Sequence, residues 1–154
     1  MELSKQSVLG TRQPRRHITI ATAGMLVGCS LAFLIQLDTA IPLSRGMVGF
    51  VVFLTGLAFA AYAGWAHGGA LPGVSSVFLL VFWMAIFPPA VAYLRGRKYA
   101  GGRYSTITLS DELSTPRSEI GHAIGQVPYI LLGVLLFGGA TFLLGVGARK
   151  LIER

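Results

Sequence analysis

Four stretches of 20 or 21 residues contain no Asp, Glu, Lys or Arg, and they constrain the fold more than any other feature of the chain. The stretches are Ile18–Leu37, Gly46–Trp65, Val74–Leu94 and Tyr129–Ala148. A helix rises about 1.5 Å per residue, so each stretch would be roughly 30 Å long, the thickness of the hydrocarbon layer of a bilayer. The stretches also lack the alternating pattern of transmembrane strands. We therefore predict an all-α membrane protein with four transmembrane helices.

The charge content of the chain agrees with this fold class. Only 12% of the 154 residues are charged, whereas a soluble domain has about 25%. The net charge of +7 comes from basic residues that flank the apolar stretches. This placement indicates contact with a lipid bilayer that has anionic head groups, rather than with nucleic acid.

Cys29 is the single cysteine, which excludes an intramolecular disulfide and a cluster of cysteine ligands.

The apolar stretches divide the chain into five parts. Residues 1–17 form a basic N-terminal tail, 18–94 a three-helix transmembrane unit, 95–128 a polar basic loop, 129–148 the fourth transmembrane helix and 149–154 a basic C-terminal tail. A cleaved signal peptide is disfavoured because the first stretch is long and no A-x-A site follows it.

A short helix is predicted within the polar loop, at about 116–127. Thr115 can cap it, Pro116 suits its first position and Glu119 complements its dipole. Apolar residues then follow at the spacing of one helix face, with Glu119 assigned to the polar face. The apolar positions are Ile120, Ala123, Ile124 and Val127. We expect this helix to lie at the membrane interface before the fourth span.

The basic residues give no clear orientation in the membrane. With four crossings, both tails and the second loop share one side and carry seven Lys or Arg, while the first and third loops carry six. The residues assigned to lipid contact and topology are Arg12, Arg15 and Arg16 in the N-terminal tail and Arg95, Arg97, Lys98 and Arg103 in the third loop. Dominance of the first helix favours a multi-pass protein of the cell (plasma) membrane with both termini in the cytoplasm. The reverse orientation, an incomplete crossing and insertion in both orientations stay open.

Small residues recur at helical spacing in three of the four stretches. Such stripes let helix backbones approach closely, which is the main packing device where lipid removes the hydrophobic drive between helices. The spacing does not say whether the partner helix belongs to the same chain or to another copy. The residues are Gly24, Gly28 and Ala32 in the first stretch, Gly56, Ala60 and Gly64 in the second, and Gly138, Thr141 and Gly145 in the fourth.

The third stretch differs from the others because it is bulky and contains adjacent prolines. Its aromatic residues either face lipid or fill space against the glycine-rich helices. Pro88 and Pro89 each remove a backbone donor and free a carbonyl four residues earlier. Transporters and channels use such freed carbonyls to bind ions, although membrane helices also tolerate prolines as simple kinks.

The sequence carries no recognisable catalytic, cofactor-binding or metal-ligating set. The three histidines lie in different connections, and the four stretches lack the ionisable groups that intramembrane chemistry generally needs. We therefore predict a small, non-enzymatic polytopic membrane protein, an accessory, scaffold or assembly component that acts through helix packing. Its partner would be a second copy or another membrane protein. The alternative is a small oligomeric channel or transporter that uses the Pro88–Pro89 kink and glycine-lined helix faces.

Overall fold

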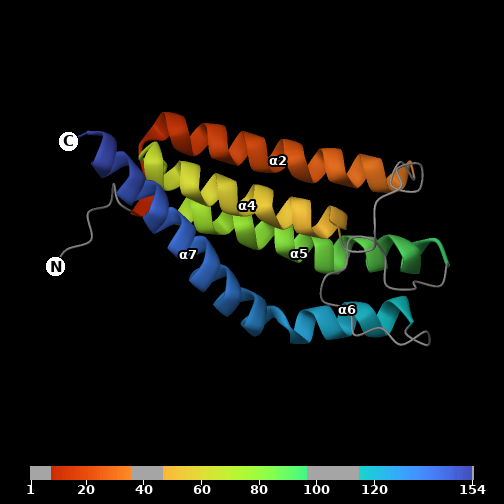
Figure 1. Cartoon of the computed structure of the whole chain (residues 1–154). Coiled ribbons are helices and arrows are strands. Elements are labelled where there is room, and N and C mark those ends of the chain that lie inside the picture. Colours follow the sequence, from red (N-terminus) through yellow and green to blue (C-terminus); the bar gives the residue numbers. More distant parts are fainter. Residues whose placement is uncertain (1–7, 36–46, 97–114, 154) are drawn as a thin grey trace.

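The computed structural model describes residues 8–35, 47–96 and 115–153. Its helices are α2 (Arg12–Leu34), α4 (Met47–Trp65), α5 (Ala70–Leu94), α6 (Pro116–Gly125) and α7 (Val127–Ile152). All except α6 are long and apolar enough to cross a membrane (Figure 1). This confirms the predicted all-α fold, with four candidate spans and a short helix before the fourth. Arg97, Lys98 and Arg103 lie outside the described residues.

The long helices run back and forth, so that the start of α2 and the end of α7 lie at the same end of the bundle (Figure 1). Thr11 donates its backbone N–H to the carbonyl of His67 at 2.7 Å, and Arg149 donates from Nη1 to the carbonyl of Gly64 at 3.2 Å. At the opposite end, Arg95 donates from Nη2 to the carbonyl of Leu34 at 3.4 Å. The N-terminal arginines and Arg95 therefore lie at opposite ends of the bundle.

Helix α5 is the central helix, and it packs against α2, α4, α6 and α7. Val77 and Leu80 are fully buried within it. Val77 lies against one glycine of α4 and one of α7. A Cβ at Gly56 of α4 would be 3.3 Å from the Cα of Val77, and a Cβ at Gly138 of α7 would be 3.4 Å from the Cγ2 of Val77. The residue of the third stretch that fills space against these glycines is therefore Val77; of the aromatic residues of α5, Trp83 is buried and Phe78, Phe82 and Phe87 are half-buried.

The paired prolines do not end α5. Pro88 and Pro89 are both buried, and the helix continues through them to Leu94. Neighbouring helices commonly compensate for the missing backbone hydrogen bonds of prolines in membrane helices.

Helix α6 packs beside the C-terminal half of α5 (Figure 1). The predicted cap is present: Thr115 accepts a hydrogen bond from the backbone N–H of Ser118, and Ser118 accepts one from the N–H of Thr115. The buried face differs from the predicted one, because Glu119 is 8% exposed while Ile124 is 58% exposed. A single residue separates α6 from α7, so the direction of α7 limits how α6 can rotate against α5.

Candidate functional site

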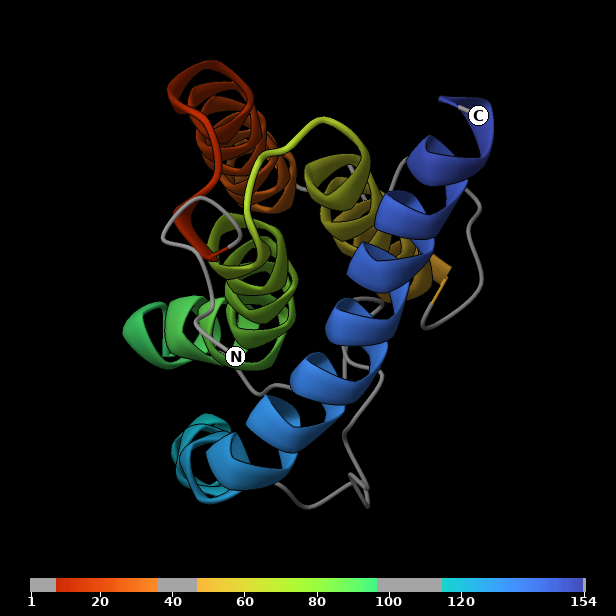
Figure 2. The ribbon, with the colours of Figure 1, turned by 90° about the vertical axis from the view of Figure 1, so that its left-hand side faces the viewer.

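Helices α4 and α7 cross with their backbones in direct contact, in the region where α7 runs diagonally over α4 (Figure 2). A Cβ atom at Gly64 would overlap the carbonyl oxygen of Phe142, and a Cβ at Gly145 would overlap the carbonyl oxygen of Ala61. Only glycine fits at either position without moving a helix. One glycine of each predicted stripe, Gly64 of α4 and Gly145 of α7, therefore lies at this crossing, whereas Gly56 and Gly138 face Val77 of α5.

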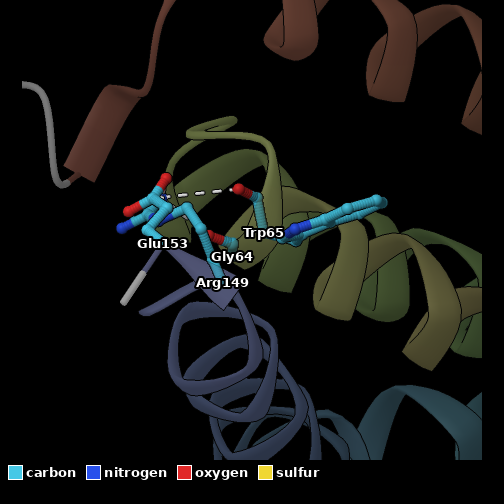
Figure 3. Close-up of polar contacts among 4 residues, drawn as sticks. All are labelled: Gly64, Trp65, Arg149 and Glu153. Atoms are coloured by element: carbon cyan, nitrogen blue, oxygen red, sulfur yellow. Dashed lines mark hydrogen bonds and ion pairs between the residues drawn. The ribbon is translucent and has the colours of Figure 1, made fainter. Parts of the chain in front are cut away.

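Arg149 joins the same two helices at the end of the bundle (Figure 3). Its Nη1 donates to the carbonyl of Gly64, and to that of Trp65 at 3.5 Å, which are the last carbonyls of α4. A cation at a helix C-terminus satisfies free carbonyls and complements the helix dipole. The ion pair between Arg149 Nε and Glu153 Oε1 is long at 3.9 Å, and Glu153 is exposed, so it contributes little.

The stripe of α2 has a different environment. A Cβ at Gly24 or at Gly28 would meet no atom within 4 Å. Together with neighbouring exposed side chains, these glycines form a surface that we call the outer α2 face. It consists of Gly24, Val27, Gly28, Leu31 and Ile35. The described part of the chain supplies no helix that covers this face.

Helix α2 is the least buried of the four long helices, and one of its attachments lies at its N-terminal end. Thr11 is hydrogen-bonded to His67, whose φ is 59°. Gly10 and Gly69 also have positive φ, of 71° and 89°, and a Cβ on either would overlap the backbone of the other segment. Ile18, buried, packs beneath Gly68. The glycine-rich turn AHGGA therefore receives the segment before α2 in backbone contact.

The second attachment lies nearer the C-terminal end of α2. Trp83 donates from Nε1 to the hydroxyl of Ser30 at 2.9 Å, and Ser30 donates to the carbonyl of Leu26 at 2.7 Å. Phe33 contacts Phe87 edge to face, with ring centroids 6.0 Å apart. Polar and aromatic contacts therefore join α2 to α5. By contrast, α4 and α7 are joined by backbone contact at glycines.

Between the two attachments, α2 and α5 leave a groove of about 280 Å³. We call it the α2–α5 groove. Its walls are mostly apolar but include four hydroxyl residues, and it is lined by Ile18, Thr19, Thr22, Ala23, Leu26, Pro72, Ser75, Ser76 and Leu79. Thr22 is buried, and its hydroxyl has no hydrogen-bond partner. Ser76, also buried, donates to the carbonyl of Gly73. The groove thus combines an apolar interior with polar groups along its length.

A second depression adjoins this groove at the N-terminal end of α2. It has a volume of about 510 Å³ and is lined by Arg12, Arg15, Arg16, Thr19 and Ile20. We call it the arginine pocket. Thr19 lines both cavities, so the two adjoin at this residue. The first turn of α2 contains no acidic residue and its N-cap makes no side-chain hydrogen bond, which leaves a concentration of positive charge at this end.

The other residues singled out from the sequence are dispersed. Within the described ranges, no three His, Cys, Asp or Glu side chains lie close enough to hold a metal ion. His67 lies in the α4–α5 turn and His122 lies on α6, where it contacts Gln126 at 3.3 Å. Neither Pro88 nor Pro89 lines the α2–α5 groove or the arginine pocket.

Sequence reasoning did not find the α2–α5 groove, the Trp83–Ser30 hydrogen bond or the backbone contact between Gly10 and Gly69. The three arginines within five residues before the first apolar stretch, Arg12, Arg15 and Arg16, were the available signal for the arginine pocket. Comparison with known proteins adds no further assignment, because no protein family, no curated protein and no solved structure matches the chain.

Proposed function

We propose that this protein is a non-enzymatic membrane scaffold or assembly component that binds a transmembrane helix of a partner on the outer α2 face. The observation that carries this proposal is the open space over Gly24 and Gly28. The two glycines are four residues apart, as in the G-x-x-x-G motif that brings two transmembrane helices into backbone contact. The equivalent glycines of α4 and α7 are already covered by helices of the same chain.

The neighbours of the two glycines suit a helix partner. Val27, Leu31 and Ile35 are 58%, 56% and 69% exposed and lie on the same side of α2 as the glycines. A partner helix would pack on these side chains, with the glycines allowing close contact. Helix–helix association in lipid depends on this kind of shape matching, since apolar burial alone contributes little there.

A photo-crosslinking experiment in native membranes tests this proposal. A photoreactive amino acid replaces Val27 in one variant and Leu144 in a control; Leu144 is an apolar residue of α7 that is 70% exposed. We expect a protein adduct from position 27, loss of this adduct on Gly28→Leu, and only lipid adducts from position 144. Equal protein adducts from both positions, or none from position 27, would contradict the proposal.

The identity of the adduct separates two forms of the partner. A covalent dimer of this chain indicates self-association through two outer α2 faces, whereas an adduct of another mass indicates a different membrane protein. Both outcomes support helix binding at this face. We do not propose the channel alternative here, since neither Pro88 nor Pro89 lines the α2–α5 groove or the arginine pocket.

A further inference from the structure

We propose that the arginine pocket and the α2–α5 groove together bind one anionic phospholipid, with its phosphate at the arginines and an acyl chain in the groove. The groove and the side chains of Arg12 and Arg15 face away from the outer α2 face: a helix turns by about 100° per residue, which places Gly24 about 160° from Leu26 around the axis. The inference therefore stands independently of the proposed helix partner.

The order of residues along one face of α2 matches the order of groups in a phospholipid. Arg12 and Arg15 come first, Thr19 and Thr22 follow, and Leu26 lies deepest, at spacings of i, i+3, i+7, i+10 and i+14. This face thus passes from cationic to hydroxyl-bearing to apolar. A phospholipid passes in the same direction from its phosphate, through the glycerol esters, to its acyl chains.

Helix α5 forms the opposite wall and also carries hydroxyl groups. It runs in the same direction as α2 (Figure 1), and its lining residues are Pro72 near its start, then Ser75 and Ser76, and Leu79 one turn further on. Hydroxyl groups therefore lie at a similar level on both walls, with apolar side chains beyond them. Arg15 to Leu26 spans roughly 16 Å of helix, about half the hydrocarbon thickness, so the site fits a lipid of one leaflet.

The positive charge at the entrance is uncompensated. None of the three arginines of the pocket has an ion pair with an acidic residue within the described ranges. They also lie in the first turns of α2, at the positive end of the helix dipole, where no side chain caps the free N–H groups. A bound phosphate would offset both charges, because backbone N–H groups and arginines are the usual partners of phosphate in proteins.

The make-up of the two adjoining cavities decides between ligands. An apolar molecule would fill the groove, whose walls are mostly apolar, but would leave the charge of the arginine pocket unpaired. A free phosphate ion would use the arginines alone and would leave the apolar groove uncovered. A phospholipid is the ligand that uses both parts of the site.

Native mass spectrometry of the full-length protein in detergent tests this inference, because detergent removes any effect of charge on membrane orientation. The protein is titrated with phosphatidylglycerol and with phosphatidylcholine that carries the same acyl chains. Each arginine near an anionic lipid contributes about a fivefold factor in affinity, so the double variant R12Q/R15Q is expected to bind phosphatidylglycerol about 25-fold more weakly. The control R117Q/K150Q removes two exposed cations outside the site and should bind as the wild type does.

A second pair of variants tests the groove without changing charge. Ala23 and Ala21 are both exposed on α2, but only Ala23 lines the groove. We expect Ala23→Phe to fill the groove and weaken phosphatidylglycerol binding at least about tenfold, as expected when binding energy from a buried chain is lost. Ala21→Phe should leave binding unchanged.

Three results would overturn the inference. Equal affinity of the wild type for the two lipids would show that the arginines do not select an anion. Wild-type binding by Ala23→Phe would show that the groove holds no chain. Displacement of the lipid by millimolar inorganic phosphate would assign the arginines to a free anion instead. Because R12Q/R15Q changes only exposed side chains, it keeps the test valid if Ala23→Phe fails to fold.

Discussion

The glycines of α2 and those at the α4–α7 crossing both belong to small-residue stripes, but they have opposite environments. Gly64 and Gly145 each lie so close to a carbonyl of the facing helix that no side chain fits, whereas Gly24 and Gly28 have no atom within 4 Å of where a Cβ would be. A stripe therefore reports only that a close approach is allowed. Whether another helix uses it depends on the arrangement of the whole bundle, and the unused stripe is the one available to a partner.

The largest expected effect is that of a single methyl group at the α4–α7 crossing. Gly64→Ala places a Cβ on the carbonyl oxygen of Phe142, so the two helices must separate along their shared face. We expect the free energy of unfolding to fall by about 3 kcal/mol, at the upper end of overpacking effects. Reversible unfolding in mixed micelles measures this change.

Gly133→Ala is the matched control. A Cβ there meets nothing within 4 Å, and the residue lies inside α7, another of the four long apolar helices. Its unfolding free energy should stay the same or rise by less than about 1 kcal/mol, since alanine is the better helix former. Equal losses for the two substitutions would show that the crossing is looser than the structure describes.

The next effect concerns the first attachment of α2. Gly69 has φ +89° and ψ 150°, a region essentially restricted to glycine, and a Cβ there would overlap Gly10 and Leu9. We expect Gly69→Ala to cost about 2 kcal/mol of stability, mostly from backbone strain. The amide of Thr11, now bonded to His67, should exchange its hydrogen much faster, while amides of α4 and α7 keep their protection.

Gly96→Ala separates strain from contact. Gly96 also has positive φ, at 62°, but open space around its Cβ position. It should lose about 1 kcal/mol, the usual cost of a left-handed non-glycine residue, without any change at the Thr11 amide. Protection of Thr11 in both variants would rule out the backbone contact as the element that holds the start of α2.

These two regions also show what the sequence can and cannot predict. The helices were predictable because a backbone in lipid must satisfy its own hydrogen bonds. A stretch that enters lipid can be recognised from its composition and length alone. The Thr115 cap was predictable because its partner is three residues away. The bond between Thr11 and His67 joins residues 56 positions apart, and the burial of Glu119 depends on how α6 meets α5. Neither the Thr11–His67 bond nor the burial of Glu119 leaves a signal in the residues nearby in the sequence.

A smaller effect is expected at the second attachment of α2. Trp83→Phe removes the hydrogen bond to Ser30 but keeps most of the ring. Hydrogen bonds between membrane helices are worth about 0.6 kcal/mol on average and up to about 1.7, so we expect a coupling energy in this range. A double-mutant cycle with Ser30→Ala measures it directly. A coupling energy of zero would mean that shape alone joins α2 to α5 at this level.

The smallest effect on the bundle, and the most informative one for function, is expected from Gly28→Ala. No described residue lies near the new methyl group, so the free energy of unfolding should change by less than about 0.5 kcal/mol, as for surface substitutions elsewhere. Binding of a partner helix should nevertheless weaken, because the methyl group occupies the space of close approach. The crosslink from position 27 would fall while the unfolding curve stays in place. A large loss of stability would instead show that Gly28 packs within the chain, and the outer α2 face would then no longer differ from the α4–α7 crossing.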